Sequence, residues 1–222
     1  KLQLADLGIA LDGDADRVVF SDEEGQIIHG DHIIAVLAKE MKLSKQLLQN
    51  QVIGTTMSNL GLEIFLDSIN INLHRTNVGD RYILDEMIKS KTNLGGEPSG
   101  HILLTDYAKT GDGLLTAIKI ISLLKKSGLK ASQYLRPFKL VPQSLKNIRN
   151  IDKNILQNNV VKQIILNEER RLGVNGRVLV RASGTEDLIR IMVESKNQKE
   201  VQEIIENIAS TIIEQNNFEK DK

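Results

Sequence analysis

Three aspartates stand at every second position in the run LGIALDGDADRVVF, residues 7–20. On a nearly extended segment the side chains of Asp12, Asp14 and Asp16 would point to one face, because successive residues of a strand alternate sides. Carboxylates this close repel one another unless a cation compensates them, and an all-oxygen site suits a hard ion such as Mg²⁺. The run therefore predicts a metal loop after a buried strand, with Gly13 permitting a tight turn where a Cβ would obstruct.

Three other interpretations of this loop compete with a magnesium site. One is a polar turn between strands, since aspartate and glycine are common turn residues. Another is an EF-hand calcium loop ending at Glu23, but Arg17 stands at the position that needs glycine, and strands flank the loop in place of helices. The third is the aspartyl phosphate chemistry of haloacid-dehalogenase-type phosphatases, which the third aspartate and the arginine fit poorly.

A second motif, LGGEPSGHI at residues 94–102, mixes glycines with three polar side chains. Glu97, Ser99 and His101 alternate along it and could present an acceptor, a hydroxyl and an imidazole to one face. Such a mixture suits sugar hydroxyls. The competing interpretation is a glycine-rich turn with a capping glutamate and a histidine that is satisfied locally.

The third motif is RASGTEDLIR, which ends at Arg190. In a hairpin turn, Ser183, Gly184 and Thr185 can offer hydroxyls and backbone N–H groups to an anion, and Arg181 and Arg190 add guanidinium groups that match phosphate oxygens. The alternative is a polar turn between two surface arginines. Taken together, the three motifs favour metal-assisted phosphoryl transfer on a phosphorylated sugar.

Composition describes an ordinary globular chain. Its 222 residues, 41% of them hydrophobic, suit one large domain or two modest ones. Lysine plus arginine equals aspartate plus glutamate at 29 each, so no overall field attracts nucleic acid or an anionic membrane. The absence of cysteine excludes disulfides, thiolate zinc sites and thiol catalysis. Without a membrane-spanning run or a signal peptide pattern in the sequence, the expected location is cytoplasmic.

Two patterns of secondary structure follow one another along the chain. The first half alternates strands and helices, which predicts an α/β layer with a largely parallel sheet; the expected strands are 7–11, 52–54, 72–76 and 102–105, and the expected helices 31–42, 60–69, 81–90 and 111–126. After a boundary near Arg136, the order of strand, helix, two strands and helix predicts a small α+β domain. Its expected strands are 139–149, 177–181 and 188–194, its helices 152–171 and 198–215, and 216–222 a frayed polar tail.

In order and in content, LDGDADR, GGEPSGH and RASGTEDLIR resemble the metal, sugar-binding and phosphate-binding loops of the α-D-phosphohexomutase superfamily. TTMSNLGLE and TNVGDRYILDEM resemble its bacterial phosphoglucosamine mutase branch. The resemblance implies the end of domain 2 at 1–27, a mixed-sheet α/β domain 3 at 28–136, and a TATA-binding-protein-like domain 4 at 137–222. It also implies that the phosphoserine nucleophile lies in a domain 1 that this sequence does not contain, so the isolated chain is expected to be inactive.

The resemblance also implies a role for each loop. The three aspartates would hold Mg²⁺ together with a phosphoserine oxygen, and Arg17 would lie close to the transferring phosphoryl group. Glu97 and Ser99 would contact sugar hydroxyls with His101 nearby, and Arg17 and His101 are the expected catalytic residues. The substrate phosphate that is not transferred would be clamped by Arg181, Ser183, Gly184, Thr185 and Arg190.

The implied reaction interconverts glucosamine 6-phosphate and glucosamine 1-phosphate through a bisphosphate, for cell-wall precursor (UDP-N-acetylglucosamine) synthesis. The partner is a hexose phosphate, not nucleic acid or membrane, and a homodimeric parent is left open. A phosphomannomutase or phosphoglucomutase would differ in the sugar that Glu97, Ser99 and the Gly79–Arg81 turn bind. The isolated chain could instead be a phosphosugar-binding fragment, and a phosphatase ranks third.

Three residues depart from the family pattern. Ala15 stands where glycine is frequent, and alanine is expected to be tolerated there unless the position needs a positive φ. Pro98 replaces a common glutamine and leaves the hexose less certain. Asp187 replaces a frequent proline, and its charge beside a phosphate site is expected to weaken binding by up to about 1 kcal/mol when exposed to solvent.

Overall fold

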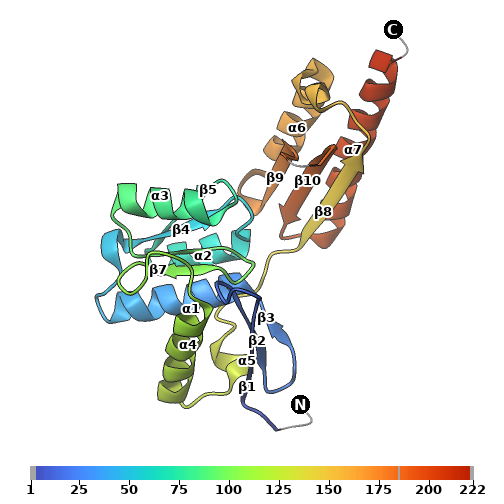
Figure 1. Ribbon diagram of the computed structural model, residues 1–222. Helices are drawn as coiled ribbons and strands as arrows, with labels where there is room; N and C mark the ends of the chain where they lie inside the picture. Colours follow the sequence, from blue (N-terminus) through green and yellow to red (C-terminus); the bar gives the residue numbers. More distant parts are fainter. Residues whose placement is uncertain (1–3, 185, 221–222) are drawn as a thin grey trace. The chain divides into compact units, whose positions relative to one another are not determined.

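The computed structural model describes residues 4–184 and 186–220. It divides the chain into two compact units, Lys1–Leu140 and Val141–Lys222, whose elements are labelled in Figure 1. The first unit ends at Leu140, whereas the sequence predicts a boundary near Arg136. Residues 4–27 lie in the first unit together with the α/β layer. No helix among the described residues is long and apolar enough to cross a membrane. The cytoplasmic location stays a prediction.

A four-stranded sheet of order β5-β4-β6-β7 forms the centre of the first unit. Parallel pairs join β4 to β5 and to β6, and an antiparallel pair joins β6 to β7, so the sheet is mixed. The strands are β4 (Gln51–Thr55), β5 (Asn72–Thr76), β6 (Leu94–Gly96) and β7 (Ile102–Leu104). The helices are α1 (Gly30–Leu43), α2 (Leu60–Ser68), α3 (Asp80–Ser90), α4 (Gly113–Ser127) and α5 (Ala131–Tyr134), with a 3-10 turn at Leu48–Asn50.

The periodic segments of the first half are confirmed as strands and helices, but β6 was not expected. Its sequence, LGG, begins the motif for which the sequence predicts a loop or a glycine-rich turn, and glycine has little preference for strands. Tertiary contacts decide otherwise, since β6 pairs with a strand on each side. A Cβ on Gly95 would lie 2.7 Å from both Ile83 and Met87 of α3, so glycine allows this helix to pack directly on the strand.

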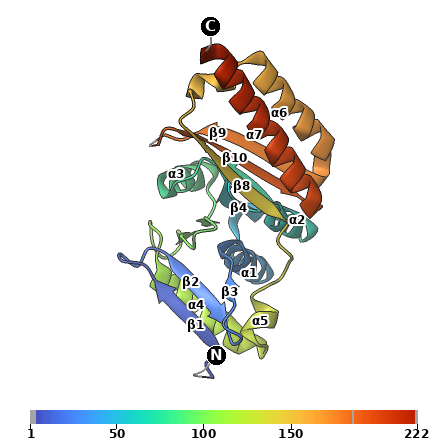
Figure 2. The ribbon, with the colours of Figure 1, turned by 90° about the vertical axis from the view of Figure 1, so that its right-hand side faces the viewer.

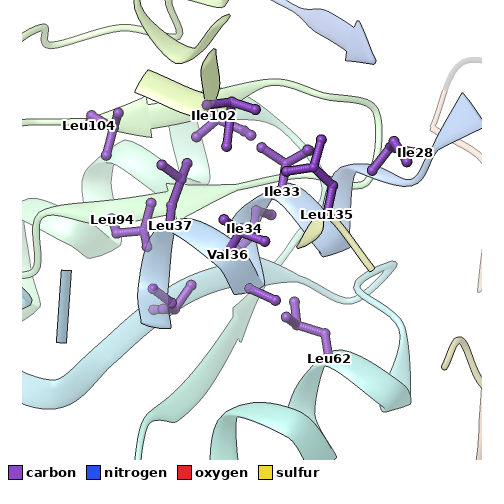
Figure 3. Close-up of a cluster of buried hydrophobic side chains, with 14 of the residues drawn as sticks. Ile28, Ile33, Ile34, Val36, Leu37, Leu62, Leu94, Ile102, Leu104 and Leu135 are labelled. Carbon is purple, nitrogen blue, oxygen red and sulfur yellow. The ribbon is translucent and has the colours of Figure 1, made fainter. Parts of the chain in front are cut away.

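Helix α1 supplies much of the core of the first unit. Its first nine residues, 30–38, are all buried, so this stretch is covered on every side. Figure 3 shows Ile33, Ile34 and Leu37 from this helix among side chains of other elements, including Leu62 of α2 and Leu94 of β6. Each such side chain stabilises the fold by about 1.5–3 kcal/mol through burial. The core thereby fixes the strand ends from which the loops of interest leave.

A separate antiparallel sheet of order β1-β2-β3 carries the three aspartates. Its strands are β1 (Leu7–Leu11), β2 (Val18–Asp22) and β3 (Ile27–Ile28). The turn after β2 is held by Arg136, whose guanidinium pairs with buried Asp22, and by Ser132, whose N–H donates to Glu23 Oε2 at 3.0 Å. The expectation that β1 is buried is wrong: Ile9 and Leu11 are 41% and 42% exposed, because β1 is the outer strand.

The second unit is an antiparallel sheet of order β8-β10-β9 packed against helices, which confirms the small α+β domain. Ile189 and Ile191 of the central strand are buried with Ile204 and Ile208 of the last helix. The strands are β8 (Gln143–Arg149), β9 (Gly176–Ala182) and β10 (Leu188–Ser195). The helices are α6 (Asn159–Leu172) and α7 (Gln198–Lys220), with 3-10 turns at Lys153–Gln157 and Gly173–Asn175.

Two expected boundaries in the second unit are wrong. The single helix expected at 152–171 is a 3-10 turn followed by α6, because Asn158 caps α6 by accepting the N–H of Val160 at 2.8 Å. The tail expected to fray from residue 216 continues α7 to Lys220. Asn216 is buried, and its Oδ1 accepts the N–H of Asp152 at 3.1 Å, so a tertiary contact extends the helix.

Candidate functional site

The aspartates form a turn between β1 and β2, here named the metal loop (Asp12–Arg17). The loop is not extended: the N–H of Ala15 donates to the carbonyl of Asp12 at 3.2 Å, and the N–H of Asp12 donates to the carbonyl of Arg17 at 3.4 Å. One carboxylate oxygen from each aspartate nevertheless lies within 4.8 Å of the other two. The predicted convergence of charge is present, but a turn produces it rather than the alternation of a strand.

In this loop the residue with a positive φ is Ala15, and Gly13 has an ordinary φ. Gly13 does not have a positive φ, and a Cβ there would meet nothing within 4 Å, so the expectation that Gly13 is needed is wrong. Ala15 has a φ of +59°, the left-handed region that costs a residue with a Cβ roughly 1–2 kcal/mol. Ala15 therefore occupies a position that needs a positive φ, where glycine would be more favourable.

These conformations predict opposite outcomes for two substitutions in the metal loop. Gly13→Ala should leave the free energy of unfolding within about 0.5 kcal/mol of wild type, because the Cβ has room and an ordinary φ. Ala15→Val should lower it by about 2 kcal/mol, since β-branched residues fit the left-handed region worst. Urea unfolding followed by circular dichroism measures both. Equal losses in the two variants would contradict this account of the turn.

Arg17 supplies the positive charge nearest the aspartates. Its side-chain Nε lies 2.7 Å from Asp12 Oδ2 and 3.3 Å from Asp16 Oδ1. The backbone N–H of Arg17 donates to Asp12 Oδ1 at 3.1 Å. Burial acts to raise the pKa of Asp12, but this N–H and the guanidinium charge outweigh it and lower that pKa. Asp12 is therefore ionised at neutral pH, as a carboxylate that binds a cation must be.

The sugar loop, Glu97–His101, connects β6 to β7 and lies against the metal loop. The N–H of Val18 donates to the carbonyl of Gly100 at 3.2 Å, and a Cβ on Gly100 would lie 2.2 Å from the Val18 carbonyl oxygen. His101 is buried, with its Nδ1 3.2 Å from Asp16 Oδ2. Its Nε2 has no hydrogen-bond partner among the described residues. The structure thus brings His101 and the aspartates together.

Glu97 joins the sugar loop to the start of α3. Its Oε1 accepts the N–H of Gly79 at 2.9 Å, and its Oε2 accepts the hydroxyl of Ser99 at 3.3 Å. Gly79 precedes α3 with a φ of +133°, which side chains rarely permit. The loops after β5 and β6 therefore meet at the carboxyl edge of the parallel strands, where open α/β sheets bind ligands.

Sequence reasoning missed two glycines, Gly30 and Gly113, that bring neighbouring backbones close to these loops. A Cβ on Gly30, the first residue of α1, would lie 2.5 Å from the carbonyl oxygen of Pro98 in the sugar loop. A Cβ on Gly113 would lie 2.7 Å from the Arg17 carbonyl oxygen, and the Gly113 N–H donates to the Ala15 carbonyl at 2.9 Å. The only signal in the sequence is a glycine at the start of each apolar helix.

Gly111 confines the imidazole of His101, because a Cβ there would lie 2.4 Å from the ring. Gly111→Ala is expected to displace the ring from Asp16 and to lower the free energy of unfolding by about 2 kcal/mol, as overpacked sites do. Histidine side-chain NMR shifts and urea unfolding measure the two effects. Gly128→Ala, at an open position with a φ of +67°, tests backbone strain alone and should leave the His101 shifts unchanged.

The phosphate loop, Arg181–Arg190, joins β9 to β10 in the second unit. Arg181 and Arg190 are directly opposed in the register, so cross-strand geometry puts both side chains on one face. Ser183 is buried; its N–H donates to the Leu188 carbonyl at 2.9 Å, and its Oγ accepts the N–H of Glu186 at 3.2 Å. A Cβ on Gly184 would meet no atom within 4 Å, and the predicted Thr185 lies outside the described residues.

Acidic residues limit the positive charge of the phosphate loop. Glu186 Oε2 accepts from Arg190 Nη2 at 2.8 Å, so one guanidinium edge is already occupied. The side chain of Asp187 is 76% exposed, and its Oδ1 lies 4.0 Å from Lys153 Nζ. Because solvent screens an exposed charge, Asp187 is expected to weaken phosphate binding by no more than about 1 kcal/mol. The loop can still offer Arg181, the Ser183 hydroxyl proton and the open backbone at Gly184 to an anion.

Comparison with known proteins agrees with this arrangement. Residues 29–140 match the family model "Phosphoglucomutase/phosphomannomutase, alpha/beta/alpha domain III", and residues 144–211 match "Phosphoglucomutase/phosphomannomutase, C-terminal domain". Curated phosphoglucosamine mutases from Sinorhizobium medicae and Granulibacter bethesdensis are 47% and 48% identical over 208 residues, 94% of this chain. The chain spans 46% of the length of each of these relatives.

Solved structures share the fold at lower identity. The Aspergillus fumigatus N-acetylphosphoglucosamine mutase, crystallised in complex with GlcNAc-6P and magnesium, is similar with a TM-score of 0.77 and 19% identity, over 92% of this chain and 51% of that one. A Burkholderia thailandensis phosphoglucomutase/phosphomannomutase family protein gives a TM-score of 0.73 at 19% identity, over 93% and 46%. With a family model matched over more than half of its residues, this chain belongs to the phosphoglucomutase/phosphomannomutase family.

Proposed function

We propose that this chain is part of a phosphoglucosamine mutase, which interconverts glucosamine 6-phosphate and glucosamine 1-phosphate through a phosphoserine and a bisphosphate intermediate, for UDP-N-acetylglucosamine synthesis. The observation that carries the proposal is the contact of two loops: the aspartate turn lies against the sugar loop, with His101 Nδ1 3.2 Å from Asp16 Oδ2. Curated phosphoglucosamine mutases 46–48% identical to the chain support the choice of sugar.

The metal loop fits a hard divalent cation. Three carboxylate oxygens within 4.8 Å of one another, one of them from an aspartate with a lowered pKa, are the donor set that Mg²⁺ prefers. Asp12, Asp14 and Asp16 would hold the ion, which when bound neutralises charge on phosphoryl oxygens. Arg17 is half exposed beside these carboxylates, and its guanidinium adds a second positive charge for the transferring group.

The sugar loop offers groups suited to hydroxyls. The two oxygens of Glu97 each accept one hydrogen bond within the protein, and a carboxylate has acceptor capacity beyond that for a sugar hydroxyl or ammonium group. Ser99 can rotate to donate or accept. His101 lies beside the metal loop with its Nδ1 3.2 Å from Asp16 Oδ2, and it would exchange a proton with the sugar oxygen that gains or loses phosphate.

The phosphate loop would hold the phosphate that is not being transferred. Its groups for this task are Arg181, Ser183, Gly184, Thr185 and Arg190. Because the bisphosphate must present each end in turn, these groups have to recognise phosphate without recognising the sugar position to which it is attached. Guanidinium and backbone N–H groups meet that need, since both match phosphate oxygens of any ester.

Turnover by a joined enzyme tests the proposal. The joined enzyme consists of this chain fused to the part of the Sinorhizobium medicae relative that it does not match. With Mg²⁺ and a hexose bisphosphate activator, it should convert glucosamine 1-phosphate faster than mannose 1-phosphate or glucose 1-phosphate, and the chain alone should convert none. Preference for mannose or glucose 1-phosphate would favour the second candidate, a phosphomannomutase or phosphoglucomutase, which the family model's own description supports.

A further inference from the structure

A short turn before α4 lies against both the metal loop and the ring of His101. The turn, named here the α4 turn, consists of Gly111, Asp112 and Gly113 in the first unit. Helix α4 begins at Gly113 and packs against β1 and β2, the two strands that the metal loop joins, as Figure 2 shows. The packing of α4 on these strands therefore brings the turn to the metal loop.

One end of the α4 turn holds the backbone of the metal loop. The N–H of Gly113 donates to the carbonyl of Ala15 at 2.9 Å, and Ala15 is the residue with a φ of +59°. A Cβ on Gly113 would lie 2.9 Å from this carbonyl oxygen and 2.7 Å from that of Arg17, so glycine is what lets the backbones approach. A residue with a Cβ stays in the left-handed region when its surroundings favour that conformation. The hydrogen bond from Gly113 supplies such a preference.

The other end of the α4 turn closes over His101. A Cβ on Gly111 would lie 2.4 Å from the imidazole, and on its other side the ring has Nδ1 3.2 Å from Asp16 Oδ2. Arg17 and His101 also form an isolated antiparallel bridge, so the metal loop and the sugar loop are paired through their backbones. The ring is thus confined between the α4 turn and a carboxylate of the metal loop.

Asp112 fixes the conformation of the turn. Its side chain accepts the N–H of Leu115 at 2.8 Å, and its carbonyl accepts the hydroxyl of Thr116 at 2.8 Å. Aspartate is among the residues preferred at this position, because it accepts an N–H that the helix itself leaves without a partner. Since Asp112 lies between the two glycines, the cap that starts α4 also sets the direction of the Gly113 N–H and the place of the Gly111 backbone.

We propose that Asp112 is a positioning residue of the candidate site, acting through the α4 turn. By capping α4 it holds Gly113 against Ala15, which keeps the three carboxylates of the metal loop convergent. It also holds Gly111 over His101. Among the described residues, the carboxylates that could share a metal ion are the three aspartates of the metal loop and not Asp112. The proposal rests on the proposed function, because it takes the metal loop as a Mg²⁺ site.

Binding of Mg²⁺ to the chain itself, followed by calorimetry and NMR, tests this role. Asp112→Ala removes the cap and should weaken Mg²⁺ affinity about tenfold, as the loss of groups that orient metal ligands does. It should also shift the side-chain signals of His101. Asp112→Asn keeps an oxygen for the Leu115 N–H and should restore affinity to within about twofold, because asparagine caps helices as well as aspartate does. A mere loss of negative charge would lower the affinity of both variants equally.

Asn158→Ala is the matched control. Asn158 caps α6 in the second unit by accepting the N–H of Val160 at 2.8 Å, so its loss removes a helix cap away from the α4 turn. This variant should change neither Mg²⁺ affinity nor the His101 signals. Unchanged affinity in Asp112→Ala, equal losses in the alanine and asparagine variants, or no Mg²⁺ binding by the wild-type chain would overturn the proposal.

A measurement on the wild-type chain needs no variant to fold. Saturating Mg²⁺ should slow deuterium exchange of the Gly113 amide about threefold, because an ion that favours the metal-loop conformation must also favour the bond from Gly113 to Ala15. Exchange that Mg²⁺ leaves unchanged would contradict the coupling. None of these readouts uses turnover. A joined enzyme without mutase activity would therefore overturn the proposed function and leave the role of Asp112 to be decided by cation binding.

Discussion

Replacing Asp12 with asparagine is expected to lower turnover of glucosamine 1-phosphate by the joined enzyme about a thousandfold. The substitution removes a charged ligand from a loop whose three carboxylates lie within 4.8 Å. A metal that neutralises phosphoryl charge contributes several kcal/mol to transition-state stabilisation, and a thousandfold corresponds to about 4 kcal/mol. The loss should appear mainly in kcat, because the sugar and phosphate loops remain to bind substrate.

The same substitution should weaken Mg²⁺ binding, which calorimetry on the chain itself can measure without turnover. Asp67→Asn is the matched control, since Asp67 is an exposed residue of α2 and belongs to none of the three loops. It should change neither kcat nor Mg²⁺ affinity. Full activity of Asp12→Asn at saturating Mg²⁺, with unchanged affinity for the ion, would exclude the metal loop as the cation site.

Acidification from pH 7 to pH 4 is expected to destabilise the first unit by about 3 kcal/mol through His32 alone. Burial, followed by the charge of His29, lowers the pKa of His32 to about 4. Its Nε2 lies 3.2 Å from the Phe138 carbonyl oxygen, so the neutral ring donates there. In the unfolded chain histidine takes up a proton below about pH 6.5, whereas folded His32 does so only near pH 4. Stability is therefore complete above pH 6.5 and is lost as the pH falls between these values.

Urea unfolding between pH 7 and pH 4 measures this loss. His32→Gln, which keeps an N–H donor for the Phe138 carbonyl, should remove most of the dependence between pH 6.5 and pH 5. Part of the slope should remain, because burial also lowers the pKa of His29. A slope that His32→Gln leaves unchanged would show that this histidine is not held neutral by the fold.

Local patterns in the sequence were sufficient for the regular elements. Apolar periodicity placed α1 and α2, and both are confirmed because each buries a continuous apolar side in the core. The three motifs also indicated which loops carry charge and hydroxyls. In two of these loops, the metal loop and the sugar loop, the structure shows the predicted residues together, with Asp16 3.2 Å from His101.

The sequence by itself determined the fold class, the family and the residue types of the site. Only the tertiary structure decided the conformation of the metal loop, the pairing of β6 and the contact of Glu97 with Gly79. The physical reason is that each depends on groups distant in sequence: a strand pair can override the low propensity of glycine, and a carbonyl or carboxylate from another loop selects one backbone conformation among several. The placement of Ala15 in the left-handed region shows this most directly, because nothing in its neighbours' types requires it.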